Sequence, residues 1–261
     1  MPVIIKRAAT NEELDQTFQL RHQVLVGDEY LARRADQRFY DRYDAFPTTC
    51  VLAALVEGQI VGTVRATVDS GIGTSVDEYF DFRSHCSPQN HRVAAGSHFY
   101  VAQGFRGQYR VSALLMDMFH FWCLRQGCRF VKGVMNPRTV SLMQRLGYDP
   151  LDAAQTSEKD GLPFIPVLLD LQRMSAPLLE YIHRQPEWGA AEPFHRLHCE
   201  AEEMIPRLDQ KLYVVQGQIA AARFARFESG DWIAPDAMQD VPLSAVSQAE
   251  LAVMDASKAG Q

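Results

Sequence analysis

The sequence lacks a long hydrophobic run, an excess of basic residues and a pattern of paired cysteines. No stretch of about 18 consecutive apolar residues occurs, so no membrane-spanning helix is expected. The formal net charge is −6, and such an acidic balance disfavours nucleic acid as a partner. The N-terminal segment has only a short apolar run before polar and acidic residues, unlike a secretory signal peptide. We therefore expect a cytoplasmic protein.

The cysteines exclude a disulfide scaffold and a zinc site of the usual kind. Their number is odd, and none forms a C-x-x-C pair or a Cys/His cluster with metal-ligand spacing. We expect reduced, mostly buried thiols and no metal site. The five are Cys50, Cys86, Cys123, Cys128 and Cys199.

The composition is that of a folded α/β protein with a sizeable core. The 261 residues are 47% hydrophobic and 22% charged, which is ordinary for a globular chain of this length. Hydrophobic periodicity predicts the order β-α-β-β-β-α-β-α-β. Strands are expected at 3–7, 48–56, 59–69, 98–105, 129–135 and 163–171, helices at 12–26, 106–126 and 136–147, and a helical segment or lid at 27–47.

The domain organisation follows from a change of composition after Leu171. Residues 1–172 are expected to form the core, residues 173–252 a helical or mixed extension, and residues 253–261 a frayed tail. The extension is compatible with covering an acyl tunnel, docking a carrier protein or forming a dimer contact. The sequence carries no signal that selects among these, nor one for the oligomeric state.

The stretch GFRGQYRVSALL places Arg106 and Gly107 between a predicted strand and a long predicted helix. Backbone amides at such a helix start, together with the positive end of the helix dipole, favour an anion such as a pyrophosphate or the phosphate of phosphopantetheine. The structural alternative is a strand-to-helix turn that merely needs a glycine.

FRGQYRVSALL, then a strand, then NPRTVSLMQRLGYDPL resembles the acyl-donor motif and following helix of the GNAT superfamily of N-acyltransferases. The resemblance implies a mixed, mostly antiparallel central sheet flanked by helices. Arg106, Gly107 and Gln108 match the family's R-G-x-G-x-G/A loop, whereas Tyr109 and Val111 stand where glycine or alanine is usual. The implied donor-binding residues are Val101, Arg106, Gly107, Gln108, Tyr109, Arg110, Val111 and Asn136.

The N-terminal half resembles a narrower group. RHQVLVGDEY, DRYDAFPTT and IVGTVRAT resemble segments of acyl-homoserine-lactone synthases and long-chain N-acyl amino acid synthases, which use acyl-acyl-carrier-protein on a GNAT core. The resemblance implies substrate-binding roles for four charged residues and no tightly bound cofactor. Tyr109 blocks one close approach to a pyrophosphate and so favours a carrier protein over CoA. The four charged residues are Arg21, Asp41, Asp44 and Arg65.

The charged residues can also be interpreted without the resemblance. Arg65 lies in an otherwise apolar strand, so its charge needs a partner, which we predict to be an Asp of DRYD or a substrate carboxylate. The spacing of Asp41 and Asp44 would place both on one helix face, and the alternative is a solvated acidic turn. Arg21, on the first predicted helix, could equally be a surface residue.

The proton acceptor is the main departure from these families. Their strand before the donor loop typically carries E-x-x-R, whereas this chain has Ala95 and His98 at those positions. A base is needed because an amine must lose a proton when it attacks a thioester. His98 can supply one at neutral pH, and its alternative is a merely hydrogen-bonded strand histidine.

Tyr148 follows the last predicted helix, in the region where many GNAT enzymes place a tyrosine that protonates the leaving thiolate. Its alternative role is packing on the sheet.

The sequence thus predicts an N-acyltransferase that moves a medium or long acyl chain from acyl-acyl-carrier-protein or acyl-CoA to the amine of an amino acid or similar small molecule by direct attack. One alternative is an acetyl-CoA-dependent acetyltransferase. The other is a non-catalytic GNAT-like module that binds an acyl ligand or a partner protein, and Ala95 is its main support.

Overall fold

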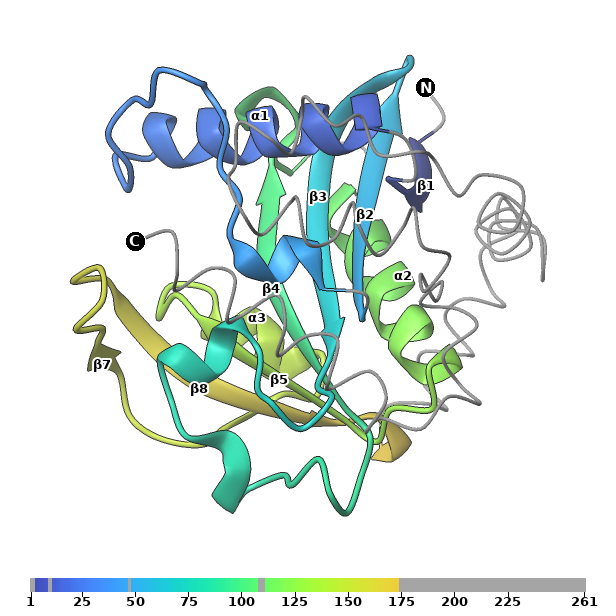
Figure 1. The fold of residues 1–261 in the computed structure, drawn as a ribbon, viewed down its shortest axis with the longest axis vertical. Coiled ribbons are helices and arrows are strands. Elements are labelled where there is room, and N and C mark those ends of the chain that lie inside the picture. The colour runs from blue at the N-terminus through green and yellow to red at the C-terminus, as the bar shows by residue number, and fades with distance from the viewer. Residues whose placement is uncertain (1–2, 9–10, 47, 108–110, 174–261) are drawn as a thin grey trace.

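The computed structural model describes residues 3–8, 11–46, 48–107 and 111–173 (Figure 1). The strands are β1 (Val3–Arg7), β2 (Thr49–Val56), β3 (Gln59–Val68), β4 (Val93–Val101), β5 (Phe130–Met135), β6 (Asp149–Pro150), β7 (Gln155–Thr156) and β8 (Pro163–Asp170). The α-helices are α1 (Asn11–Gly27), α2 (Val111–Arg125) and α3 (Val140–Arg145). Short 3₁₀ turns are η1 (Arg42–Ala45), η2 (Ser75–Glu78), η3 (Phe82–Ser84) and η4 (Gln103–Phe105).

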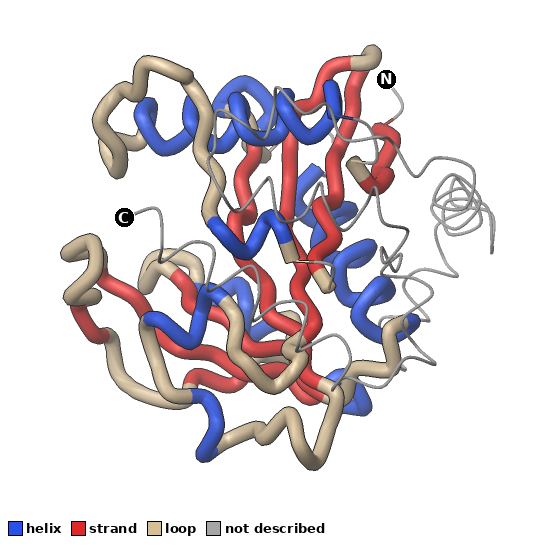
Figure 2. The backbone as a smooth tube through the Cα atoms, in the orientation of Figure 1, coloured by secondary structure: helices blue, strands red, loops and turns tan. Residues whose placement is uncertain are grey.

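The strands form one mixed, mostly antiparallel sheet in the order β1-β2-β3-β4-β5-β8-β6, with β7 beside β8. Among the described pairs only β4 and β5 are parallel, and their pairing runs from Val93–Phe130 to Gly96–Gly133. Beyond that point each strand continues without the other. Figures 1 and 2 show the result, with β2, β3 and β4 upright and alternating in direction, and β5 and β8 crossing below them.

The two faces of the sheet are covered by different helices because side chains alternate along a strand. On β2, Val51 and Ala53 pack with Phe18 of α1. Leu52 and Ala54 point the other way, into the larger core that α2 covers. The faces are therefore distinct: α1 lies on one, and α2 and α3 on the other.

The predicted order of elements is confirmed, while several details were wrong. Within the segment 27–47, which was predicted to be helical or a lid, residues 28–41 form a loop that leads into η1 rather than a helical segment. The third strand spans Val93–Val101, not 98–105, since its start is a run of small residues with weak strand preference and its expected end forms η4. The short strands β6 and β7 were not predicted. The expected extension and tail at 173–261 lie outside the described residues, apart from Arg173.

Two expectations about composition can be compared with the fold. The four cysteines within the described part are buried, as expected, and Cys199 lies outside it. In the part of the chain that the structure describes, no helix is both long and apolar enough to cross a membrane.

Candidate active site

Arg65 is the centre of a buried ion-pair cluster on the face that α1 covers. It lies on β3 and is fully buried. Its Nη1 and Nη2 atoms bind the two oxygens of Asp41 at 2.5 and 3.0 Å, and Nη1 also lies 3.1 Å from Asp44 Oδ2. Its Nε donates to Ser97 Oγ on β4 at 2.9 Å. The prediction that an Asp of DRYD neutralises Arg65 is confirmed.

The turn η1 fixes both aspartates in place. Asp41 is its N-cap, and the carboxylate accepts from the Tyr43 backbone N–H at 2.9 Å. Asp44 accepts in return from the Asp41 backbone N–H at 3.0 Å, which completes a capping box. Asp44 also binds Nη1 of Arg21 at 2.9 Å, and that arginine is fully buried on α1. The alternatives of a solvated acidic turn and a surface arginine are therefore wrong.

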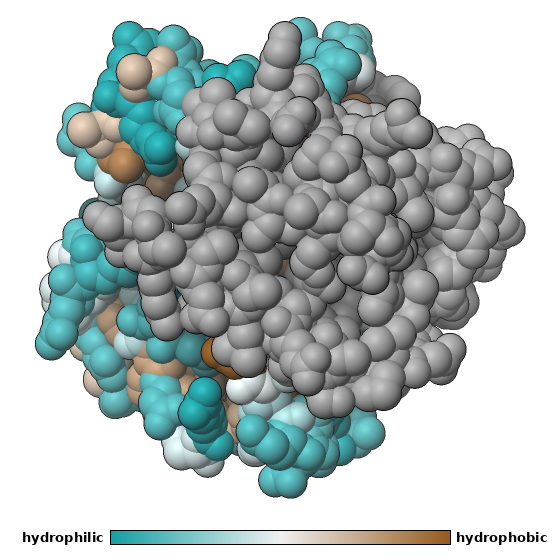
Figure 3. All heavy atoms as spheres, viewed as in Figure 1, coloured by the Kyte–Doolittle hydropathy of each residue, from teal (hydrophilic) through white to brown (hydrophobic). Residues whose placement is uncertain are grey.

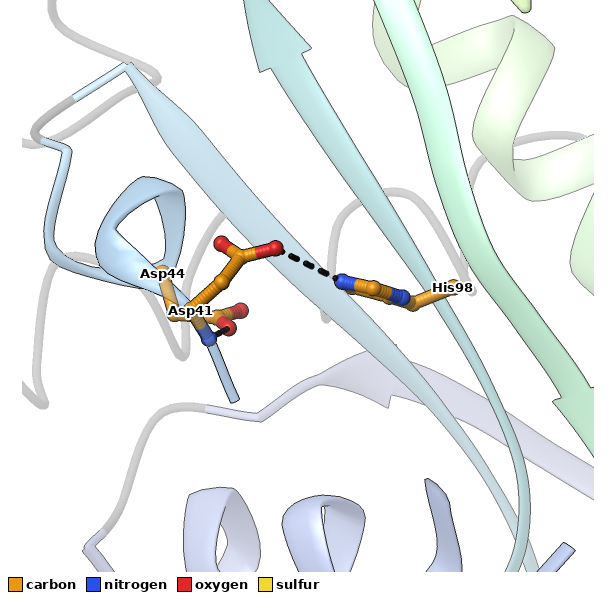
Figure 4. A group of neighbouring side chains, drawn as sticks. All are labelled: Asp41, Asp44 and His98. Atoms are coloured by element: carbon orange, nitrogen blue, oxygen red, sulfur yellow. Dashed lines mark hydrogen bonds and ion pairs between the residues drawn. The ribbon is translucent and has the colours of Figure 1, made fainter. Parts of the chain in front are cut away.

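His98 reaches the cluster because β4 carries a bulge. Thr63 pairs with Tyr100 and Arg65 with Ser97, so that one residue of β3 faces two of β4. His98 has φ +52°, a left-handed conformation that is unusual for a residue other than glycine. In a regular strand Ser97 and His98 would face opposite sides, and the bulge turns both toward η1. His98 Nε2 lies 3.1 Å from Asp41 Oδ2 (Figure 4).

The charges of this pair follow from its surroundings. Burial alone would raise the pKa of Asp41, but the Arg65 guanidinium and the His98 hydrogen bond hold it well below its usual value. Burial and the Arg65 charge lower the pKa of His98 to about 4, against the opposing effect of Asp41. At neutral pH the pair is thus a carboxylate and a neutral imidazole. Nε2 must donate to Asp41, which leaves the lone pair of Nδ1 as a proton acceptor.

Most of the cluster is inaccessible to solvent. Its two partly exposed members are Asp41 and His98, the residues that can exchange a proton with a substrate. Asp41 keeps 30% of its side chain exposed and His98 13%, whereas Arg65 and Asp44 keep 0% and 3%. Phe39 contacts the His98 ring edge-on, with centroids 5.4 Å apart. The accessible chemistry is therefore a carboxylate and an imidazole beside an aromatic ring.

The same residues could be taken for a metal site, because ligand atoms of Asp41, Asp44 and His98 lie within 4.8 Å of one another. Two guanidinium groups, from Arg21 and Arg65, already neutralise the two carboxylates. A divalent cation would have to displace these groups and would be repelled by them. The arrangement suits an ion-pair network that orients His98 better than it suits a metal.

Ala95 lies on β4 two residues before Ser97 and is paired with Thr67 of β3. It is buried with Val76 and Phe82, beneath η2 and η3. Its methyl group accepts no proton. Within the described residues, the histidine is therefore the proton acceptor that β4 offers next to the cluster.

The loop after α1 contacts residues that follow β4 and β5, close to the predicted donor loop. Arg106 donates from Nε to the Val101 carbonyl at 3.0 Å and binds the Asp28 carboxylate through both Nη atoms at 3.0 and 2.8 Å. Asn136, after β5, donates to Tyr30 Oη at 3.3 Å. The surface of this loop is mainly hydrophilic (Figure 3). Asp28 and Tyr30 were not singled out in the sequence, which offered no signal for this path of the loop.

The expected donor loop is described only in part. Gly107 has φ +73°, a left-handed conformation that glycine adopts readily. Val111 begins α2, and its side chain is fully buried in the core. Gln108, Tyr109 and Arg110 lie outside the described residues.

Tyr148 lies in the core with α2 rather than in the Asp41–His98 cluster. Its side chain is 2% exposed, and its hydroxyl lies 2.8 Å from His120 Nε2. Burial raises its pKa well above the ordinary value, which makes it a poor proton donor. The packing alternative therefore describes its surroundings better than the acid role does.

A family model described as N-acyl amino acid synthase FeeM matches residues 16–170, more than half of the chain. The chain belongs to this family. It is therefore an N-acyltransferase, an enzyme that transfers an acyl group to an amine. No curated protein sequence gives a significant match.

Solved structures similar to this FeeM-family chain agree with a GNAT-type fold. FeeM from uncultured soil microbes is 13% identical with a TM-score of 0.58, over 66% of this chain and 93% of that one. The CoA-dependent acyl-homoserine lactone synthase BjaI, with SAM and isopentyl-CoA, is 21% identical with a TM-score of 0.51, over 70% and 90%. The AHL synthase LasI is 19% identical with a TM-score of 0.51, over 65% and 89%.

The segment matched to the FeeM family contains the whole ion-pair cluster. It also contains Ser97 and Phe39, which were not predicted and which hold Arg65 and flank His98. Neither has a recognisable sequence signal, since a serine in a strand and an aromatic residue in a loop are both common.

Proposed function

We propose that this FeeM-family chain transfers a medium or long acyl chain from acyl-acyl-carrier-protein or acyl-CoA to the amine of an amino acid or similar small molecule. The amine attacks the thioester directly, without an acyl-enzyme. The observation that carries the proposal is the Asp41–His98 pair, in which His98 lies on the bulge of β4, beyond the last residue that pairs with β5.

The pair supplies the proton transfer that aminolysis of a thioester requires. As the new C–N bond forms, the amine proton becomes acidic and passes to Nδ1 of His98. Nε2 keeps its hydrogen bond to the Asp41 carboxylate, which stabilises the imidazolium while Arg65 and Ser97 hold the carboxylate and strand in position. The C–S bond then breaks, and the proton passes to the leaving thiolate, which departs as a thiol.

The described cysteines support direct attack. Burial raises the pKa of Cys86 to about 11 and that of Cys128 to about 12, and it raises the pKa of Cys123 well above its ordinary value. Protonated, buried thiols are poor nucleophiles. An acyl-enzyme on any of these three is therefore disfavoured.

The state of Arg106 favours a carrier protein as donor. Its guanidinium is already neutralised by Asp28, so that it has less charge to offer a pyrophosphate. A carrier protein presents one phosphate where CoA presents more, which demands less positive charge at this point. A pantetheine arm would then lie between the diverging ends of β4 and β5.

The test is a product assay with both kinds of donor. Acetyl, medium-chain and long-chain thioesters, each on a carrier protein and on CoA, are incubated with an equimolar mixture of amino acids and simple amines. Mass spectrometry should find an amide with a medium or long chain, and the yield should be higher with the carrier protein. Amide formation with the acetyl thioester alone would favour the acetyltransferase alternative, and absence of amide across all donors would refute the proposal.

A further inference from the structure

Glu78, at the end of η2, is a charged residue that the proposed reaction does not yet use. Its carboxylate accepts from the Tyr43 hydroxyl at 2.8 Å and binds Nη2 of Arg42 through the same oxygen. Both partners belong to η1, the turn that Asp41 caps. Lys159, in the loop between β7 and β8, binds the other carboxylate oxygen. Glu78 thus joins η1 to a turn that lies 35 residues further along the chain.

The turn η1 needs such support because it is short. It has four residues, and a single turn of this kind has too few backbone hydrogen bonds to be stable alone. Toward the sheet, its two aspartates bind the buried Arg65 guanidinium. Toward η2, two of its side chains bind Glu78. The turn is therefore held from two directions, and Glu78 supplies the contact from η2.

Tyr43 connects Glu78 to the catalytic pair. Its backbone N–H donates to the Asp41 carboxylate at 2.9 Å, while its hydroxyl donates to Glu78. The residue is buried, and its ring lies 5.0 Å from the Phe46 ring and 5.8 Å from Cζ of Arg65. Because a ring packed in this way has little room to rotate, a shift of its hydroxyl end also moves the backbone N–H that holds Asp41.

Glu78 is negatively charged at neutral pH. Burial alone would raise the pKa of its carboxyl group, but the hydrogen bonds from Lys159 and Tyr43 and the charges of Lys159 and Arg42 hold it below its usual value. The side chain is still 23% exposed, so water screens these ion pairs and limits their contribution to overall stability. Loss of the carboxylate should therefore displace η1 and leave the protein folded.

We propose that Glu78 is a positioning residue for the proton transfer. Through Tyr43 and Arg42 it holds η1 in place. The Asp41 carboxylate then stays at hydrogen-bonding distance from His98 Nε2, 3.1 Å away. This inference rests on the proposed function, in which the Asp41–His98 pair accepts the amine proton, and it extends the site to a second turn that acts through the first.

The His98 ring gives a readout that needs neither donor nor acceptor. Long-range ¹H–¹⁵N spectra of the ring identify which nitrogen carries the proton, and the signals are assigned by their absence in His98→Gln. The wild type should show one tautomer, with the proton on Nε2. Glu78→Ala should show a mixture of both tautomers, because a displaced Asp41 no longer selects one. A folded Glu78→Ala protein with the single wild-type tautomer would overturn the inference.

Kinetics separate positioning from general damage. Glu78→Ala should lower kcat between about tenfold and 10²-fold, as for a small misplacement of catalytic groups, with KM values within about twofold of the wild type. Glu78→Gln keeps an oxygen that accepts from Tyr43 and should restore most of kcat. The matched control is Asp160→Ala, which removes the neighbouring 3.0 Å hydrogen bond from Tyr79 and should keep kcat within about twofold. Equal losses in Glu78→Ala and Asp160→Ala would contradict the assignment.

A double substitution tests the path through Tyr43. Tyr43→Phe keeps the ring and removes the hydroxyl that donates to Glu78. Combined with Glu78→Ala, it should lower kcat little further than Glu78→Ala alone, since both changes break the same contact. Fully additive losses would show that Glu78 acts by another route and would refute the proposed path.

The inference and the proposed function fail differently. If no donor yields an amide but the His98 tautomer changes in Glu78→Ala, the proposed reaction is wrong and the positioning contact stands. If the wild type forms amide and Glu78→Ala matches it in kcat and tautomer, the inference is wrong and the acyltransferase proposal stands. Should Glu78→Ala fail to fold, as shown by circular dichroism, Tyr43→Phe takes its place, and an unchanged tautomer and kcat in that variant would overturn the inference.

Discussion

His98→Gln removes the proposed proton acceptor while keeping most of its surroundings. A glutamine amide can donate to Asp41 as Nε2 does over 3.1 Å, so Arg65 and Asp41 keep their ion pair. The variant loses ring contacts to Phe39 and Tyr100, whose centroids lie 5.4 and 6.0 Å away. At about 0.5–1.5 kcal/mol each, these contacts imply a loss of stability of about 1–3 kcal/mol, which should leave the protein folded.

The expected loss of activity is larger than such a change in packing would cause. A positioned base contributes about 10²- to 10⁴-fold to the rate, so kcat should fall by that factor, equivalent to about 3–5 kcal/mol of transition-state stabilisation. Ser97→Ala is the matched control on the same strand. It removes only the 2.9 Å hydrogen bond to Arg65 Nε, and its kcat should stay within about tenfold of the wild type.

The pH profile distinguishes loss of a base from general damage. Because burial and the Arg65 charge lower the pKa of His98 to about 4, the imidazole is a proton acceptor throughout the neutral range. The wild-type kcat/KM should therefore show no His98-dependent fall near pH 6.5, and its His98-dependent fall should come only toward pH 4. His98→Gln should lack this acidic limb while sharing any alkaline limb set by the acceptor amine. A folded His98→Gln protein that keeps more than a tenth of the activity, with an unchanged profile, would refute the reasoning.

Three further predictions concern other parts of the molecule. Asp28→Asn should free Arg106 and lower the KM for the acyl donor several-fold with a stability change below about 1 kcal/mol, since the pair is exposed; an unchanged KM would exclude Arg106 from donor binding. Lys132→Met should lower the free energy of unfolding by about 3–5 kcal/mol in a urea titration, because it leaves the buried Asp69 without a counterion, and a loss below about 1 kcal/mol would contradict this. Burial lowers the pKa of His120 to about 3, so the unfolded chain takes up its proton first and stability is lost as pH falls from 6.5 toward 3; the melting temperature of His120→Gln should decline less over that range, and an equal decline would argue against it.

The sheet could be predicted because its signals are local. The strands predicted at 48–56 and 59–69 leave only Glu57 and Gly58 between them, and both residues adopt positive φ, 51° and 79°, as a tight hairpin turn requires. Helix α2 ends at Arg125, next to the predicted end at 126, and Gly127 beyond it has φ +69°, a conformation typical of the residue after a helix. Such features depend on a few neighbouring residues, so a single sequence is enough to predict them.

The ion-pair cluster was predictable only in part. A charge in an apolar strand must be neutralised, and this argument predicted that Arg65 would pair with an Asp of DRYD or with a substrate carboxylate; the structure shows the first. The depth of Arg21 was not predictable, because a charged residue on a helix is usually exposed and the partner Asp44 lies 23 positions away.

The bulge of β4 was hidden from the sequence. It places a left-handed residue at His98, where no glycine or asparagine marks the position, and it reverses the side to which the ring points. Strand alternation would have put His98 on the face of α2. The path of the loop from Asp28 to Tyr30 across the ends of two strands was hidden for a similar reason, since its contacts join residues far apart in the chain.

The central claim is that the acceptor amine attacks the thioester directly, with Asp41 and His98 handling the proton. Intact-protein mass spectrometry after incubation with a long-chain acyl donor, before and after addition of an amino acid, tests it most directly. The protein mass should stay unchanged in both samples, with amide and free thiol appearing in equal amounts once the amino acid is present. An increase equal to the acyl group that forms without acceptor and disappears when the amino acid is added would contradict the account.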